Sequence, residues 1–117
     1  DVPKGHPSLS SIALNVTANV LGLANAATPF GLKAMEQLQQ LNDKPDTATP
    51  AMITFFALNS ACLTLLPATA IALRARAGAS DPSVIIVPAA LASTAAAVSV
   101  LLIDAYLRRR TRRERHR

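Results

Sequence analysis

The chain has 117 residues, half of them hydrophobic, with three Phe, one Tyr and no Trp. This length allows one domain, whose core must come from aliphatic and small side chains. The net charge of +5 is uneven, because residues 1–107 carry five basic and six acidic side chains whereas residues 108–117 carry seven Arg and one Glu. A nucleic-acid-binding protein needs a positive surface on its folded body, so we expect no nucleic acid partner.

Three stretches without charge, residues 8–31, 47–73 and 82–103, are each long enough to cross about 30 Å of hydrocarbon, which takes about 20 helical residues. We place membrane helices at 8–27, at 50–76 with an interruption near Pro67, and at 82–107. The last is apolar on every side, and a chain of this length cannot wrap three such helices in protein. The predicted fold is an all-α integral membrane helical bundle with interrupted or re-entrant helices.

The first stretch carries amide side chains at helical spacing. Asn15 and Asn19 lie four residues apart and therefore on one helix face, which Gly22 and Ala26 continue. In lipid, small residues let another backbone approach and amides bond across to it. The same amides are also typical of a site for a polar solute, because polar groups in a membrane segment face a partner or a cavity.

Turn-forming residues follow inside this apolar run. The segment NAATPFG predicts a helix end near Asn25 and a new helix near Pro29, with Thr28 as its N-cap. Residues 30–41 then predict a short amphipathic helix. Interrupted helices at membrane depth line cavities or are buried in protein, and their free N–H ends bind solutes and ions. The second stretch repeats the pattern with Asn59, Thr64 and Pro67.

Two polar connectors separate the stretches. Residues 42–50 hold two Pro and alternating charges, while in residues 77–82 Gly78 predicts a helix end and Ser80 or Asp81 the next cap. The Arg-rich segment 108–117 is a basic tail that we place in the cytoplasm. If 82–107 spans, Arg74 and Arg76 lie outside; alternatively Pro67 turns the second stretch back before it crosses.

The last stretch repeats small residues every four positions at Ala89, Ser93 and Ala97, a spacing that favours helix packing in membranes. Asp104 lies four residues before Arg108, at the edge of the apolar segment. We expect these two side chains to pair with each other, although a role for Asp104 in ion coupling is the alternative.

Several longer motifs are specific: VPKGHP at the start, NAATPFGLKAMEQLQ, LLPAT followed by IALRA, and the DP opening of the last helix. Together they resemble the spore maturation protein A family of nucleoside-recognition, or Gate, domain membrane proteins. The resemblance extends from Val2 to about Leu107, which makes residues 1–107 a Gate-like membrane domain. Family members carry further membrane helices before this region, so the chain resembles their C-terminal portion, and the Arg tail departs from the family pattern.

The resemblance implies a second membrane half of the spore maturation protein B type, and related Gate domains form part of concentrative nucleoside transporters. We therefore expect a multi-pass protein of the bacterial inner membrane with a cytoplasmic C-terminus. Its partners would be lipid and other membrane helices, either such a second half or further copies of the chain, with a polar solute as a possible ligand.

Two functions remain open. The first is a transport or solute-recognition subunit, whose candidate binding residues are Asn15, Asn19, Asn25, Thr28, Asn59 and Thr64. The second is a structural helix-packing subunit of a larger membrane complex without a solute site. An enzyme is not expected, because catalytic triads, paired membrane carboxylates and phosphate-binding Gly loops are absent from the sequence. Cys62 is the sole cysteine, and His6 and His116 lie far apart, so we expect no metal and no cofactor.

Overall fold

The computed structural model describes residues 2–115 of the chain, and these residues form helices and no strands. The all-α part of the predicted fold is therefore confirmed. In chain order the elements are α1 (Pro7–Val20), α2 (Ala24–Gln39), α3 (Pro50–Ser60), α4 (Ala68–Arg76), the 3-10 helix η1 (Pro82–Ile85) and α5 (Ile86–Arg115).

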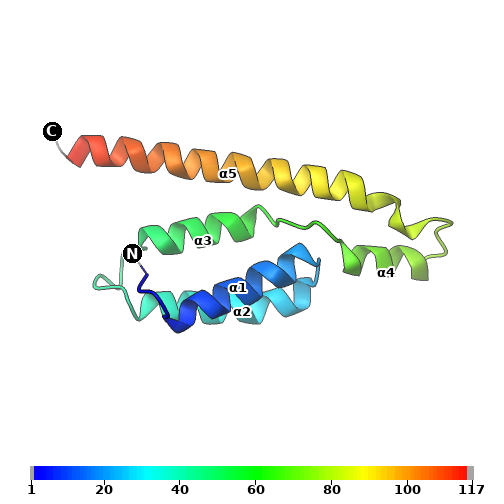
Figure 1. Cartoon of the computed structure of the whole chain (residues 1–117), viewed down its shortest axis with the longest axis horizontal. Helices are drawn as coiled ribbons and strands as arrows, with labels where there is room; N and C mark the ends of the chain where they lie inside the picture. Colours follow the sequence, from blue (N-terminus) through cyan, green and yellow to red (C-terminus); the bar gives the residue numbers. More distant parts are fainter. Residues whose placement is uncertain (1, 116–117) are drawn as a thin grey trace.

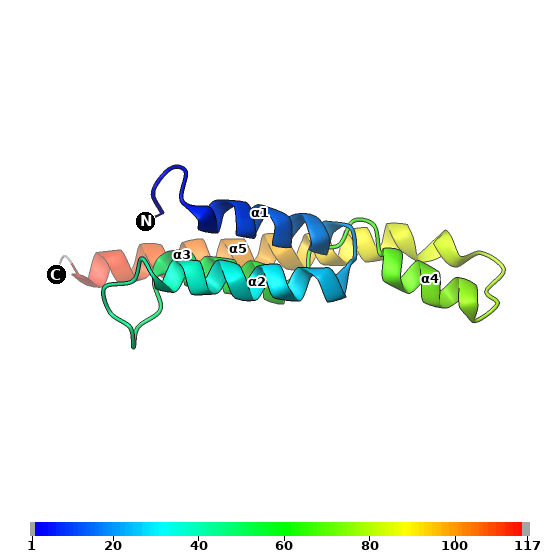
Figure 2. The same ribbon diagram turned by 90° about the horizontal axis from the view of Figure 1, so that it is seen from below.

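The helices lie along one direction and give an elongated molecule of 60 × 28 × 24 Å. Helices α1 and α2 form an antiparallel hairpin, and α3 lies between this hairpin and α5 (Figure 1). Helix α4 continues beyond the end of α3 and lies near the start of α5, at the end of the molecule opposite the C-terminus (Figures 1 and 2). The structure thus places the two interrupted segments side by side.

The first interruption comes earlier than predicted. Helix α1 ends at Val20, and Gly22 follows with a positive φ of 65°. The N–H of Leu23 bonds to the carbonyl of Ala18, and the N–H of Gly22 bonds to that of Asn19, which is the pattern of a glycine-terminated helix. The expected single helix over 8–27 is wrong because Gly22 ends it, and Gly22 does not extend the amide face.

Helix α2 begins at Ala24, so the prediction of Thr28 as the N-cap of a helix starting near Pro29 is also wrong. Pro29 lies inside α2, where its missing N–H removes one hydrogen bond near the start of the helix. The amphipathic pattern expected for 30–41 is present within α2, since Ala34 and Leu38 are buried. These two residues form the apolar core with Phe55 of α3.

The second interruption agrees with the sequence. Helix α3 ends at Ser60 and α4 begins directly after Pro67, which lies at the N-cap position. Gly78, with φ 78°, follows the end of α4, and the Asp81 carboxylate caps η1 by accepting a hydrogen bond from the Ser83 N–H. The bonds from Ser83 lower the pKa of Asp81 below its usual value.

In the described part of the chain, one helical segment, Pro82–Thr111, is long and apolar enough to cross a membrane. Only 6% of its apolar stretch is buried in the chain. Helices α1 and α2 have 14 and 16 residues, fewer than the roughly 20 that a complete crossing needs. Helix α5 also continues through the start of the predicted basic tail as far as Arg115.

Candidate functional site

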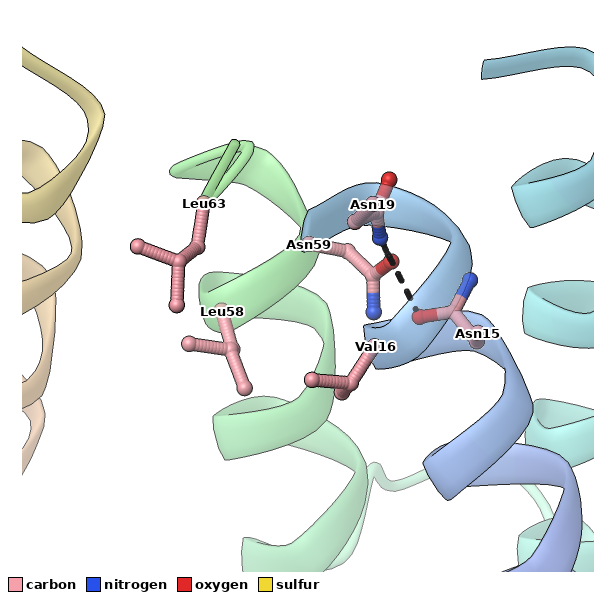
Figure 3. Close-up of a pocket in the computed structure, with 6 residues that line it drawn as sticks. All are labelled: Asn15, Val16, Asn19, Leu58, Asn59 and Leu63. Carbon is pink, nitrogen blue, oxygen red and sulfur yellow. Dashed lines mark hydrogen bonds between the residues drawn. The ribbon is translucent and has the colours of Figure 1, made fainter. Parts of the chain in front are cut away.

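The amides of Asn15, Asn19 and Asn59 meet where α1 contacts α3. The Asn19 Nδ2 donates to Oδ1 of Asn59 at 3.0 Å and to Oδ1 of Asn15 at 3.3 Å. Figure 3 shows the side chains of Asn15 and Asn19 on one face of α1, on the side that faces Asn59 of α3. The helical spacing of four residues aligns the α1 pair, and the fold brings in Asn59 from 40 positions further along the chain.

This cluster is tied to the backbone on both sides. Asn15 is 2% exposed, and its Nδ2 donates to the carbonyl of Ala27 on α2 at 2.8 Å. Asn59 uses its Nδ2 to donate to the carbonyl of Phe55 at 2.9 Å. Both polar ends of Asn15 and of Asn59 therefore have partners inside the chain, and the network connects α1 with α2 and α3.

Gly31 makes room for this network. A Cβ at that position would lie 2.9 Å from the Asn15 Nδ2, which is closer than ordinary contact. The missing side chain allows the buried amide to reach α2. Sequence reading did not identify Gly31 as part of the site, because the crossing of α1 over α2 had to be known first.

The cavity beside the amides is small. Its volume is about 10 Å³, and it is lined by Asn15, Val16, Asn19, Leu58, Asn59 and Leu63 (Figure 3). A volume of this order accommodates about one water molecule. In this arrangement the cluster is a hydrogen-bonded helix contact, and a solute of nucleoside size does not fit unless side chains move.

The two helix breaks touch each other close to this cluster. The N–H groups of Leu65 and Leu66 donate to the Val20 carbonyl at 3.0 and 2.9 Å, and the Thr69 hydroxyl donates to the Gly22 carbonyl at 2.6 Å. A Cβ on Gly22 would lie 2.6 Å from the Leu66 oxygen. The segment 61–67 therefore crosses directly over the turn between α1 and α2.

The other predicted site residues lie apart from the amide cluster. Asn25 and Thr28 are exposed on α2 and do not line the cavity. The Thr64 hydroxyl donates to the Cys62 carbonyl at 3.2 Å, while the Thr64 carbonyl accepts a 2.7 Å bond from the Ser93 hydroxyl of α5. Thr64 thus joins the crossing segment to α5.

Two further groups of polar contacts between helices were not predicted from the sequence. Ser11 of α1 donates to the Gln37 Oε1 of α2 at 2.7 Å. At the other end of α3, the Thr54 hydroxyl donates to the Asp104 carboxylate at 2.8 Å, and Arg108 donates to Thr54 and to the Pro50 carbonyl. Polar pairs thus fasten α1 to α2 and α3 to α5.

The expected pairing of Asp104 with Arg108 is confirmed by an ion pair of 3.0 Å. The carboxylate also accepts the Thr54 hydroxyl, so Asp104 is committed to a contact between helices. Across the residues that the structure describes, no group of three or more His, Cys, Asp or Glu side chains is arranged to hold a metal ion.

The chain is similar to spore maturation protein A of Bacillus subtilis (strain 168), with 43% identity over 106 residues. These residues make up 91% of this chain and 54% of that relative, so the chain spans about half the length of the curated relative that it matches. No family model and no solved structure matches the chain.

Proposed function

Because the chain belongs to the spore maturation protein A family, we propose that it is a helix-packing unit of a larger membrane protein complex. The observation that carries this proposal is the amide cluster, in which Asn15 and Asn59 each donate one hydrogen bond and accept another within the chain, beside a cavity of about 10 Å³. Asparagines that bond across helices hold membrane bundles together, where apolar side chains give little preference for one another over lipid.

The surface of α5 supports assembly with other membrane components. Leu91, Leu102 and Ile103 are 68%, 66% and 59% exposed on this helix. Apolar side chains that remain uncovered over such a length are stable against lipid or against other apolar helices. We propose that this surface contacts the bilayer and packs against further membrane helices, which belong to a second half of the spore maturation protein B type or to another copy of the chain.

The proposed topology is multi-pass in the bacterial inner membrane with the C-terminus in the cytoplasm. Helix α5 would cross once, and the hairpin of α1 and α2 would enter from the side that holds the C-terminus, because the N-terminal end of α1 lies at that end of the molecule (Figure 1). The Arg residues from Arg108 onward favour the cytoplasmic side. Ser80 would then lie on the outer side.

Photo-crosslinking tests the assembly role. A photoreactive amino acid at Leu102, which is 66% exposed, should attach to the partner half or to a second copy after co-expression in bacterial membranes. The matched control is Ala97, which lies on the same helix and is 4% exposed. Lipid adducts alone at position 102, at 91 and at 103 would contradict an assembly role for α5.

Solute recognition by the amides is the second candidate. One observation favours it. The amide oxygen of Asn19 points away from the amides of Asn15 and Asn59 (Figure 3), so this acceptor is directed out of the network. Equilibrium binding of labelled nucleosides and other polar solutes to the reconstituted chain distinguishes the two functions. The helix-packing role predicts no saturable binding, whereas saturable binding that Asn19→Leu abolishes would establish a solute site.

A further inference from the structure

A second and much larger cavity lies along helix α4. It is a surface groove of about 340 Å³, within the range of ligand sites, and it lies between the start of α2 and helix α4. Its lining residues are Leu23, Ala68, Thr69, Ala72, Leu73 and Arg76. The walls are mainly apolar, and none of the six residues is acidic.

One face of α4 forms most of this groove. Counted from Thr69, the positions of Ala72, Leu73 and Arg76 are i+3, i+4 and i+7, which places all four residues on the same side of the helix. Leu73 is 61% exposed, so the apolar wall is open to its surroundings. The Thr69 hydroxyl is already used as a donor to the Gly22 carbonyl, which fixes α4 against the first helix break.

The two arginines of α4 have different surroundings. Arg74 points to the other side, where its guanidinium donates to the Asp81 carbonyl at 3.5 Å. Arg76 lines the groove and is exposed, and among the side chains that the structure describes no acidic one forms an ion pair with it. The groove therefore combines a long apolar wall with one positive charge at the C-terminal end of the helix.

The position of the groove suits a membrane surface. Helix α4 lies beside the start of α5, at the end of the molecule opposite the Arg-rich C-terminus (Figures 1 and 2). If α5 crosses the bilayer, as the proposed function requires, Arg76 comes to lie near the headgroups of the far leaflet while the apolar wall faces the acyl region. Long basic side chains reach headgroups from such positions.

We propose that this groove binds one anionic phospholipid. An acyl chain would lie along Leu23, Ala72 and Leu73, and the phosphate would bind the Arg76 guanidinium, which offers several N–H donors in a plane. The charge of the groove selects an anionic headgroup over a zwitterionic one. The apolar wall selects a lipid over free phosphate. This site rests on the membrane placement of the proposed function and is separate from the amide cluster.

Lipid retention tests the proposal. The full chain is inserted into nanodiscs made of equal parts phosphatidylglycerol and phosphatidylcholine, and native mass spectrometry measures which lipid stays bound after release. Wild type should retain phosphatidylglycerol in preference, and Arg76→Gln should reduce this preference about fivefold. The matched control, Arg74→Gln, removes the same charge two residues away and should leave the preference unchanged.

A second variant tests the apolar wall. Ala72→Phe fills the groove while Arg76 keeps its charge, and it should also lower retention of phosphatidylglycerol. An excess of inorganic phosphate should not displace the lipid from wild type, and displacement by phosphate would overturn the lipid assignment. Equal losses in Arg74→Gln and Arg76→Gln would reduce the effect to general surface charge and overturn the site.

Two different results in nanodiscs distinguish failure of the lipid site from failure of the proposed function. A chain that enters nanodiscs with native helicity but shows no preference for phosphatidylglycerol overturns the lipid site alone. A chain that does not enter the bilayer at all overturns the membrane placement on which both proposals depend.

Discussion

Gly22 is the position where a single methyl group should disturb the structure most. Its φ of 65° is one that L side chains rarely adopt, at a cost of about 1–2 kcal/mol for a residue other than glycine. A Cβ there would lie 2.6 Å from the Leu66 oxygen and 2.8 Å from both the Ala68 nitrogen and the Pro67 Cα. All three are backbone atoms, so the crossing segment would have to move.

Forcing extra volume into a tight contact costs about 1–3 kcal/mol. Together with the conformational cost, Gly22→Ala should lower the free energy of unfolding by about 2–5 kcal/mol. Gly78→Ala is the matched control, because Gly78 also has a positive φ, of 78°, but a Cβ there would meet nothing within 4 Å. The control should lose about 1–2 kcal/mol.

Both variants can be measured by titrating the purified chain with SDS in mild detergent while circular dichroism follows helix content. The difference between the two losses isolates the contact of segment 61–67 with the turn at Gly22. Equal losses for Gly22→Ala and Gly78→Ala would refute the close crossing of the two helix breaks.

Two further predictions concern contacts near the two ends of α5. Thr54→Val removes the hydroxyl that donates to Asp104, and it should lower the free energy of unfolding by about 1–2 kcal/mol in the same SDS titration. The control Thr94→Val, at an exposed position of α5, should lower it by less than about 0.5 kcal/mol, and equal effects would contradict the α3–α5 contact. The pKa of Asp81 is lowered by its bonds from Ser83, so its cap stabilises the fold above the usual carboxyl pKa and is lost as the pH falls through the lower folded-state value. An NMR titration of Asp81 should therefore show a pKa that rises toward the usual value in Ser83→Ala, and an unchanged pKa would count against the cap.

The sequence was sufficient for features that depend on local chemistry. Helical spacing placed Asn15 beside Asn19, and the same rule paired Asp104 with Arg108. Pro67 marked the second interruption because proline removes a backbone donor. In each case the determining interaction lies within a few residues along the chain.

The first interruption was misplaced because two signals competed. Asn25 is a common turn residue and Pro29 a strong helix breaker, yet both lie within α2. Gly22 ended the helix instead, since it alone can adopt the positive φ without strain while the backbone of segment 61–67 approaches it. That approach is a tertiary contact, and the spacing of residues in α1 does not predict it.

Contacts between distant segments were also beyond local rules. The sequence grouped Asn59 with the α1 amides by residue type, but it could not show that Asn59 would accept from Asn19 while Asn25 stayed exposed on α2. The role of Thr54 as the partner of Asp104 depended likewise on how α3 packs against α5.

The amide cluster as a structural contact is the central claim, and a double-mutant cycle between Asn19 and Asn59 tests it most directly. The unfolding free energies of Asn19→Leu, Asn59→Leu and the double variant are measured in the same detergent and compared with wild type. The 3.0 Å bond between the two amides predicts a coupling energy of about 1 kcal/mol, within the range of hydrogen bonds between membrane helices. Additive losses, with a coupling below about 0.3 kcal/mol, would contradict a structural role for the cluster.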